Sequence, residues 1–486
     1  MLRRATALKR ICDRQRVQNA ENLMYNKNQL KIVDKLLAKK FAYIISKTNY
    51  RFLFNSIIGI VVSIDTWPRE DVVLELLKKL PEDDQHLFKL LFLCYPQKIN
   101  SVNNTLKEEG ISFLINAGLV KKEQDLLIPT GYSILPINDM LLIVSLPYSY
   151  SQSKTKAADI YLGQDSMRLM QMVTHRKYKS VLDLCAGSGI QGMALKNVAK
   201  KIYAVEINHN TLVAIRLNQM LNNISEEQYC VLEGDIYSPV DVKEQFECIL
   251  SNPPYVPVPE NMELPICGAG GEDGLKFANK IIDGYKKFLQ KNGYAYMVLE
   301  CIGNEKHPYV LDYMKNELKQ GCINVSLINK MPIEAQIDFS VSMAVSYYDQ
   351  PQKADYYRKI WEDIFRKHKA TAMYSAVIEY IKTDEPLQIN IVHNYNQWAP
   401  TSHFRVREDA ILEEECIAYY HIRYPDYDGG YIQKKILDLL LENKDKTVYE
   451  ICKELNSEDF MPNTLKEVIN TLINLEARGI IQRVEI

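Results

Sequence analysis

The fold is decided by Val181-Leu182-Asp183-Leu184-Cys185-Ala186-Gly187-Ser188-Gly189, an apolar segment that runs into a glycine-rich turn. The apolar part predicts a buried strand, and glycine lets the following backbone turn sharply and approach a ligand closely. Gly187 to Gly192 fits the G-x-G-x-x-G pattern of nucleotide-binding folds, and the next helix would present free N–H groups at its N-terminus. This stretch therefore predicts a ligand-binding sheet of the α/β class.

The chain on both sides of this turn alternates between strand-like and helix-like segments over residues 151–350. This alternation predicts a mostly parallel sheet with helices on both faces, in which ligands bind beyond the carboxyl ends of the strands. The expected strands are 180–184, 201–207, 229–233, 248–251 and 293–300. Functional residues should therefore follow these strands directly.

Two further regions flank this predicted domain. Residues 1–150 are expected to form a helical N-terminal domain with a winged-helix-like part at about 83–145. Residues 351–486 are expected to form a C-terminal domain that is helical from Asp355 to Thr383 and ends in a winged-helix-like segment at 431–486. That segment contains ten acidic and eight basic residues, whereas a duplex-binding module should carry a basic face. We therefore expect it to pack, dimerise or shape a substrate site.

The composition is that of a globular protein. Its 486 residues are 47% hydrophobic and 25% charged with a net charge of -2, which excludes a disordered chain and gives no global attraction to nucleic acid. The sequence has no C-x-x-C pair and no H-E-x-x-H motif, so we expect no bound metal. The N-terminus lacks the apolar run of a signal peptide, and the apolar stretch from Phe52 to Ile64 is too short to span a bilayer. These features favour a cytoplasmic protein without a membrane partner.

Acidic residues lie at or after three consecutive predicted strands, at Asp183, Glu206 and Asp235. A carboxylate four residues before Gly187 suits a ligand with a positive ammonium and sulfonium group better than it suits a pyrophosphate. With these residues the sequence resembles the class I, Rossmann-like methyltransferases, whose mostly parallel sheet has seven strands. The resemblance implies S-adenosylmethionine as methyl donor, with Glu206 on its ribose hydroxyls and Asp235 on its adenine amino group.

The same resemblance implies a wider set of residues around the donor, drawn from the glycine turn and from the loops beside it. The set comprises Gln164, Asp183, Ala186, Gly187, Ser188, Gly189, Glu206, Ile207, Asp235, Ile236 and Asn252. Cys185 lies in the same turn, but no histidine is near it in the sequence, and a small residue is favoured there for packing rather than as a nucleophile.

The most specific motif is Asn252-Pro253-Pro254-Tyr255, which follows the fourth predicted strand. Two consecutive prolines fix two φ angles, remove two backbone donors and hold the preceding residue extended. The stiff turn presents the Asn252 carboxamide and the Pro253 carbonyl as two acceptors for one N–H₂ group. Tyr255 could pack against a flat amide or base, or against a developing cation. These positions predict methyl transfer to a nitrogen, with Asn252, Pro253 and Tyr255 as the catalytic residues.

Downstream, Gly268-Ala269-Gly270-Gly271-Glu272-Asp273-Gly274-Leu275 resembles the GG-x-DGL segment of the release-factor glutamine methyltransferases, which methylate a side-chain amide nitrogen. The resemblance covers about residues 155–305. The loop from Ala158 to Ser166 departs from the proline-containing version of that subfamily, and the flanking regions are foreign to it. The acceptor therefore stays open at this point.

Four functional hypotheses follow. The first is an N-methyltransferase for an amine or amide of a protein, peptide or small metabolite, which could work as a homodimer. The second keeps the chemistry with an RNA or DNA base as acceptor, because the same turn serves exocyclic base amines. The third is a nicotinamide-dependent oxidoreductase that uses the same glycine turn. The fourth is a non-catalytic interaction protein with this fold.

Overall fold

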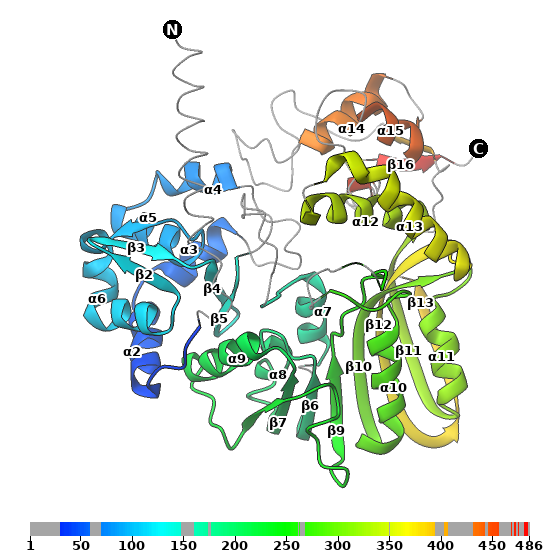
Figure 1. Cartoon of the computed structure of the whole chain (residues 1–486), viewed down its shortest axis with the longest axis horizontal. Helices are drawn as coiled ribbons and strands as arrows, with labels where there is room; N and C mark the ends of the chain where they lie inside the picture. Colours follow the sequence, from blue (N-terminus) through cyan, green and yellow to red (C-terminus); the bar gives the residue numbers. More distant parts are fainter. Residues whose placement is uncertain are drawn as a thin grey trace. The chain divides into compact units, whose positions relative to one another are not determined.

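A computed structural model of the chain describes most of its residues (Figure 1). The described residues are 30–58, 70–146, 160–173, 176–260, 262, 268–348, 350–393, 403–406, 431–442, 446–455, 468, 471–472, 475 and 481–484. Two compact units divide the chain, and the first contains Met1–Pro253, Pro265–Cys267 and Gly284–Met297. The second contains Pro254–Leu264, Gly268–Asp283 and Val298–Ile486. The domain boundaries that we predicted at residues 150 and 350 stay predictions.

The first unit begins with helices and short strands. Its helices are α2 (Lys35–Ser46), α3 (Tyr50–Ile57), α4 (Glu70–Leu77), α5 (Glu82–Leu91) and α6 (Ile99–Asn116). Its strands β1 (Gln97–Lys98), β2 (Val120–Glu123) and β3 (Leu126–Pro129) form a sheet in the order β1-β3-β2, and β4 (Tyr132–Ile137) pairs with β5 (Met140–Ser145). Lys107 interrupts α6 with a φ of 54° and divides it into two helical parts. The winged-helix interpretation of this region stays a prediction.

The central sheet confirms the expected α/β class. Its strands are β6 (Tyr178–Leu184), β7 (Ala199–Glu206), β8 (Tyr229–Glu233), β9 (Phe246–Ser251), β10 (Leu289–Gly303), β11 (Gln320–Pro332), β12 (Ala372–Pro386) and β13 (Gln388–His393), in the order β13-β11-β12-β10-β9-β6-β7-β8. The strands β8, β7, β6, β9 and β10 pair in parallel, and Figure 1 shows most of them side by side. Burial of β6 from Val181 to Leu184 is typical of a parallel strand covered on both faces.

Helices separate most of these strands, as the sequence pattern predicts, although β9 follows β8 without a helix between them. They are α7 (Gln164–Val173), α8 (Ile190–Met193), α9 (His209–Leu221), α10 (Lys276–Phe288), α11 (Tyr309–Glu317), α12 (Ile333–Tyr348) and α13 (Ala354–Lys367), with a short 3₁₀ helix at Pro351–Lys353. The first helical turn of α9 is capped by Asn208, whose side chain accepts from the N–H groups of Asn210 and Thr211.

Two expectations about the sheet were wrong. The described residues of the central sheet form eight strands rather than seven, and β13 is an edge strand that pairs in parallel with β11. Helix was expected from Asp355 to Thr383, but only α13 is helical there, and β12 is a strand antiparallel to β11. Residues 372–378 of β12 are all buried, and a strand that fills the sheet interior gains more from this packing than from the helix propensity of alanine and methionine.

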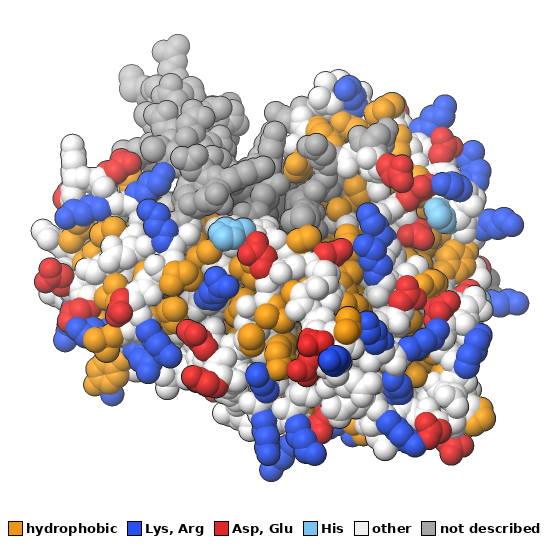
Figure 2. Space-filling view, turned by 60° about the horizontal axis from the view of Figure 1, so that its bottom comes forward, with side chains coloured by type: hydrophobic (Ala, Val, Ile, Leu, Met, Phe, Trp, Pro, Cys, Tyr) orange, Lys and Arg blue, Asp and Glu red, His pale blue; other side chains and the backbone are white. Residues whose placement is uncertain are grey.

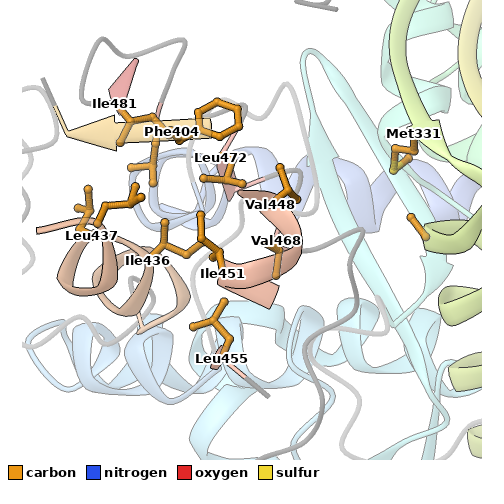
Figure 3. Close-up of a cluster of buried hydrophobic side chains, with 13 residues drawn as sticks. Met331, Phe404, Ile436, Leu437, Val448, Ile451, Leu455, Val468, Leu472 and Ile481 are labelled. Atoms are coloured by element: carbon orange, nitrogen blue, oxygen red, sulfur yellow. The ribbon is translucent and has the colours of Figure 1, made fainter. Parts of the chain in front are cut away.

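The C-terminal part of the second unit has its own small core (Figure 3). Strand β14 (His403–Val406) lies between β15 (Lys446–Thr447) and β16 (Ile481–Val484), and helices α14 (Tyr431–Glu442) and α15 (Val448–Leu455) pack beside them. The core includes Phe404, Ile436 and Ile451, together with Met331 and Ala335 from the β11–α12 region. Most of the third helix that we expected here lies outside the described residues, and the winged-helix interpretation stays a prediction.

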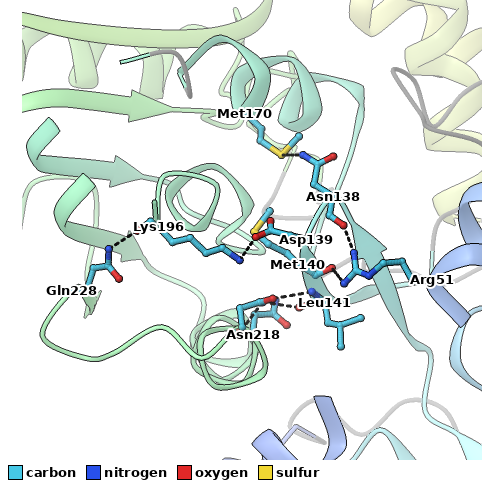
Figure 4. Close-up of polar contacts among 10 residues, drawn as sticks. Arg51, Asn138, Asp139, Met140, Leu141, Met170, Lys196, Asn218 and Gln228 are labelled. Atoms are coloured by element: carbon cyan, nitrogen blue, oxygen red, sulfur yellow. Dashed lines mark hydrogen bonds and ion pairs between the residues drawn. The ribbon is translucent and has the colours of Figure 1, made fainter. Parts of the chain in front are cut away.

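Helix α9 completes the hydrogen bonding of strand β5 on the side away from β4. Asn222 accepts from the N–H and donates to the carbonyl of Leu141, at 2.8 Å each. One turn earlier, Asn218 does the same with Ile143, at 2.6 and 3.2 Å. The two asparagines are four residues apart on the helix and meet alternate residues of the strand, so their amides replace a neighbouring strand. Figure 4 shows Asn218 beside Leu141, with the Lys196–Asp139 ion pair close by.

No helix among the described residues combines the length and the apolar character needed to cross a membrane.

Candidate active site

The glycine turn after β6 has the geometry that the sequence predicts. Gly187 and Gly189 adopt φ angles of 54° and 79°, in the left-handed region that favours glycine. A Cβ at Gly189 would lie 2.9 Å from the Met193 side chain and 3.0 Å from the Tyr229 hydroxyl, so this glycine is required for packing. A Cβ at Gly187 would meet only the Cys185 carbonyl, at 3.9 Å, and the space beside Gly187 can receive a ligand.

The remaining small residues of the turn are buried. The N–H of Ala186 donates to the carbonyl of Val205 at 3.0 Å, which ties the turn to strand β7. Ser188 has a buried hydroxyl oxygen without a hydrogen-bond partner, and its carbonyl accepts from Asn218 at 3.0 Å. Because unpaired buried polar atoms are rare in native proteins, the Ser188 hydroxyl is a candidate contact for a bound ligand.

Cys185 is affected by its burial and by three nearby acidic side chains. Burial, followed by the charges of Glu206, Asp183 and Asp235, raises the pKa of its thiol far above the ordinary value. The thiol therefore stays protonated and is a poor nucleophile, which agrees with the packing role that we expected. Acidic side chains around this turn favour a cationic ligand and oppose the pyrophosphate of a dinucleotide.

Asp183 stabilises the glycine-rich turn through a backbone hydrogen bond. Its carboxylate is buried and accepts a hydrogen bond of 3.0 Å from the N–H of Gly192 at the end of the glycine-rich sequence. Burial raises the pKa of Asp183 to about 7, although the bond from Gly192 acts in the opposite direction. The contact of Asp183 with the ammonium group of a donor stays a prediction.

Glu206 ends strand β7 and faces the turn. Its carboxylate accepts from the N–H groups of Gly187, Ile207 and Asn208, each at 2.9 Å. These bonds fix the orientation of the carboxylate at the sheet edge, where the side chain is only partly buried. Ile207, predicted to contact the donor, is 53% exposed and offers an apolar surface beside it.

Asp235 and Ile236 follow strand β8 in a constrained turn. Asp235 is exposed, and its backbone N–H donates to the Ser238 hydroxyl at 2.8 Å. Ile236 is buried with a φ of 50°, a strained conformation for a β-branched residue. The turn is joined to β7 by a 3.0 Å hydrogen bond from Gly234 to the carbonyl of Glu206. Asp235 and Glu206 thus lie at the ends of adjacent strands, as predicted.

Asn252 is held by a residue that the sequence analysis did not place in the site. Its amide nitrogen donates to the Asp165 carboxylate at 3.0 Å and to the Ser166 hydroxyl at 3.3 Å. Asp165 also accepts from the Tyr161 hydroxyl and from the Ser166 N–H, at 3.1 and 2.8 Å. With the nitrogen directed to acceptors, the carboxamide oxygen of Asn252 is oriented to accept from another group. Gln164, predicted to contact the donor, begins the helix that carries Asp165.

The contact between Asp165 and Asn252 was hard to predict from the sequence, because the two residues are 87 positions apart. The only hint in the sequence was the position of Asp165 directly after Gln164, which the resemblance places beside the donor. Asn218 was missed as well, because an asparagine inside a helix usually has no special meaning.

Tyr255 belongs to the second unit, whose first segment begins at Pro254. The backbone after it pairs with the predicted glycine-rich segment, through bonds of 2.8 Å from Val256 to Gly268 and from Gly270 to Val256. A Cβ at Gly274 would lie 2.3 Å from the Tyr255 carbonyl, and one at Gly270 would lie 2.7 Å from the Tyr255 Cα. These two glycines therefore allow the close approach that fixes the Tyr255 backbone.

Comparison with known proteins places this region in context. The family model of the methyltransferase small domain matches residues 161–321. A release factor glutamine methyltransferase of Clostridium acetobutylicum is 29% identical over 161 residues, which cover 31% of this chain and 55% of that protein. A protein of Methanocaldococcus jannaschii, named as a candidate protein N5-glutamine methyltransferase, is 31% identical over 149 residues, which cover 30% and 73% of the two chains.

A ribosomal protein uL3 glutamine methyltransferase of Burkholderia pseudomallei is 32% identical over 145 residues, which cover 26% of this chain and 45% of that protein. Apart from the Methanocaldococcus protein, the chain spans about half the length of these curated relatives. The residues that the family model matches, 161–321, include the strands and loops that carry the predicted site.

Proposed function

Because this chain belongs to the class I methyltransferase family that includes the protein glutamine methyltransferases, we propose that it transfers a methyl group from S-adenosylmethionine to the side-chain amide nitrogen of a protein glutamine. The observation that carries the proposal is the orientation of Asn252. Its amide nitrogen donates to Asp165 and Ser166. The carboxamide oxygen is therefore left to accept a hydrogen bond from an N–H of the methyl-accepting amide. A primary amide offers two N–H groups, and the adjacent Pro253 carbonyl would take the second.

The residues of the glycine turn fit the proposed donor. Glu206 is fixed by three backbone N–H groups and would accept from the ribose hydroxyls, while the exposed Asp235 would accept from the adenine amine. Ile207 and Ile236 would flank the adenine. The negative field that acts on Cys185 complements the sulfonium and ammonium charges of the donor. When bound, the donor supplies an electrophilic methyl group.

The proposed mechanism uses positioning and hydrogen bonding. The methyl group would pass to the amide nitrogen, the electron pair of the broken carbon–sulfur bond would stay on sulfur, and one N–H proton would be released to water. Asn252 and Pro253 accept the N–H bonds, keep the lone pair aligned with the methyl group and stabilise the positive charge that develops on nitrogen. Tyr255 would pack against the flat amide and the same developing charge.

Two other hypotheses receive less support. The nicotinamide hypothesis requires a pyrophosphate beside carboxylates whose field favours a cation. The nucleic-acid hypothesis requires a basic surface, but basic and acidic side chains are interspersed on the face shown in Figure 2. A cytoplasmic location and a homodimer stay predictions.

The test compares the Asn252→Ala and Asp165→Asn variants with the wild-type chain. Calorimetry measures the affinity for S-adenosylmethionine, and a labelled methyl donor with mass spectrometry measures transfer and identifies the methylated residue. We expect Asn252→Ala to bind the donor within about threefold of wild type and to lose transfer by about 100-fold or more. Asp165→Asn should also reduce transfer, because its own amide would oppose the present orientation of Asn252. Unchanged turnover in Asn252→Ala, or a label on a nucleobase, would refute the proposal.

A further inference from the structure

We propose that Trp361 of helix α13 is a positioning residue for the loop that carries Tyr255. Its indole N–H donates to the Pro257 carbonyl at 3.1 Å, across 104 residues of sequence. Both residues belong to the second unit, and helix α13 (Ala354–Lys367) lies beyond residue 321, where the matched methyltransferase domain ends. The effect on catalysis that we expect from Trp361 rests on the proposed function.

The loop has two independent supports. On one side, Val256 and Val258 donate to the carbonyls of Gly268 and Gly271, at 2.8 Å each. Pro257 lies between these two residues in the chain, and its carbonyl accepts the hydrogen bond from Trp361. The glycine segment thus fixes the N–H groups of the loop, and the tryptophan fixes a carbonyl between them. Release of that carbonyl would remove one of the two supports of the segment directly after Tyr255 and allow it to open more often.

Trp361 is itself firmly held. Its side chain is fully buried in a cluster that includes Tyr357, Phe365 and Ile302, and Met262 from the loop region packs against the same cluster. A buried indole N–H needs an acceptor, and a buried proline carbonyl needs a donor, so loss of either partner leaves a polar group unpaired. The bond is therefore stronger as a positional constraint than a contact at the surface.

A second bond joins α13 to the glycine-rich segment that pairs with the loop. Lys367, at the end of α13, pairs with Glu272 of the glycine-rich segment at 2.7 Å, and its side chain is 64% exposed. Exposed ion pairs contribute little because solvent screens them and their side chains lose entropy. Lys367→Met is therefore a matched control that removes a link between α13 and this region without touching the buried bond.

The experiment uses the full chain with the variants Trp361→Phe, Phe365→Leu and Lys367→Met. Trp361→Phe keeps an aromatic ring but removes the N–H, whereas Phe365→Leu perturbs the same core without contacting the loop by a hydrogen bond. Hydrogen–deuterium exchange of peptides covering residues 254–258 reports loop opening, and steady-state kinetics with calorimetry report kcat, the KM for the acceptor and donor affinity.

Trp361→Phe should speed exchange of these peptides by roughly threefold to tenfold, as expected for the loss of one net hydrogen bond. It should also lower kcat while donor affinity stays unchanged, and both control variants should keep wild-type kcat and loop exchange. Wild-type exchange in Trp361→Phe would overturn the inference, as would faster exchange with unchanged kcat, or an equal loss of kcat in Phe365→Leu. A wild-type chain that methylates no glutamine would refute the proposed function instead, and the exchange result would still decide whether Trp361 holds the loop.

Discussion

Replacement of Asp183 by asparagine should change how the free energy of unfolding depends on pH. Burial raises the pKa of this carboxyl from 3.8 to about 7 in the folded protein. The folded state therefore holds the proton more tightly than the unfolded state, and stability falls as the pH rises between these two values. A difference of about three pKa units corresponds to about 4 kcal/mol, lost between roughly pH 4 and pH 7.

Asp183→Asn keeps an oxygen that can accept the hydrogen bond from Gly192 and removes the ionisation. The new amide N–H₂ group needs partners of its own, which lowers stability by about 1–3 kcal/mol at every pH. The informative quantity is therefore the difference in the free energy of unfolding between variant and wild type, compared at two pH values. A cost that does not depend on pH cancels in this comparison. This difference should move in favour of the variant by about 4 kcal/mol from pH 4 to pH 8.

The assay is urea unfolding of both proteins at several pH values, followed by a probe in the first unit. Other groups titrate in both proteins and cancel in the comparison. Parallel pH profiles for the two proteins would contradict the reasoning, since they would mean that Asp183 is ionised without cost in the folded state. A profile in which wild type gains stability as the pH rises, relative to the variant, would reverse the sign and refute it as well.

Three further predictions concern the turn and its supports. Cys185→Gly should be more stable than Cys185→Ala by about 1 kcal/mol, because both lose the thiol but only glycine accepts the φ of 56° freely; equal urea midpoints would contradict this. Asn218→Ala should lower the free energy of unfolding by about 3 kcal/mol or more and weaken donor binding, since Asn218 also holds the Ser188 carbonyl. Asn222→Ala should lower stability as well, but calorimetry should find its donor affinity retained. Glu206→Gln should weaken donor binding by about tenfold to 100-fold, the value of a charge-assisted hydrogen bond, and wild-type affinity in this variant would remove Glu206 from the donor site.

Local patterns in the sequence were sufficient for the central sheet and for the turn after it. Apolar runs of strand length and glycines at turns predicted β6 to β9 in the right places, because these signals depend on neighbouring residues. Strand β12 was mistaken for helix because its alanine and methionine residues have helix propensity, and only the surrounding sheet makes the strand favourable. The contact between Asp165 and Asn252 could not be predicted, since it depends on which loops the folded sheet brings together.

The asparagine contacts of strand β5 have a consequence for the order in which the chain is synthesised. Leu141 is synthesised 81 residues before Asn222, its hydrogen-bond partner, and Ile143 is synthesised 75 residues before Asn218. Until α9 has emerged, one side of β5 presents unpaired N–H and C=O groups, which favour pairing with other chains. A fragment that ends near residue 150 should therefore aggregate during expression, whereas one that continues through residue 222 carries the helix that covers this edge.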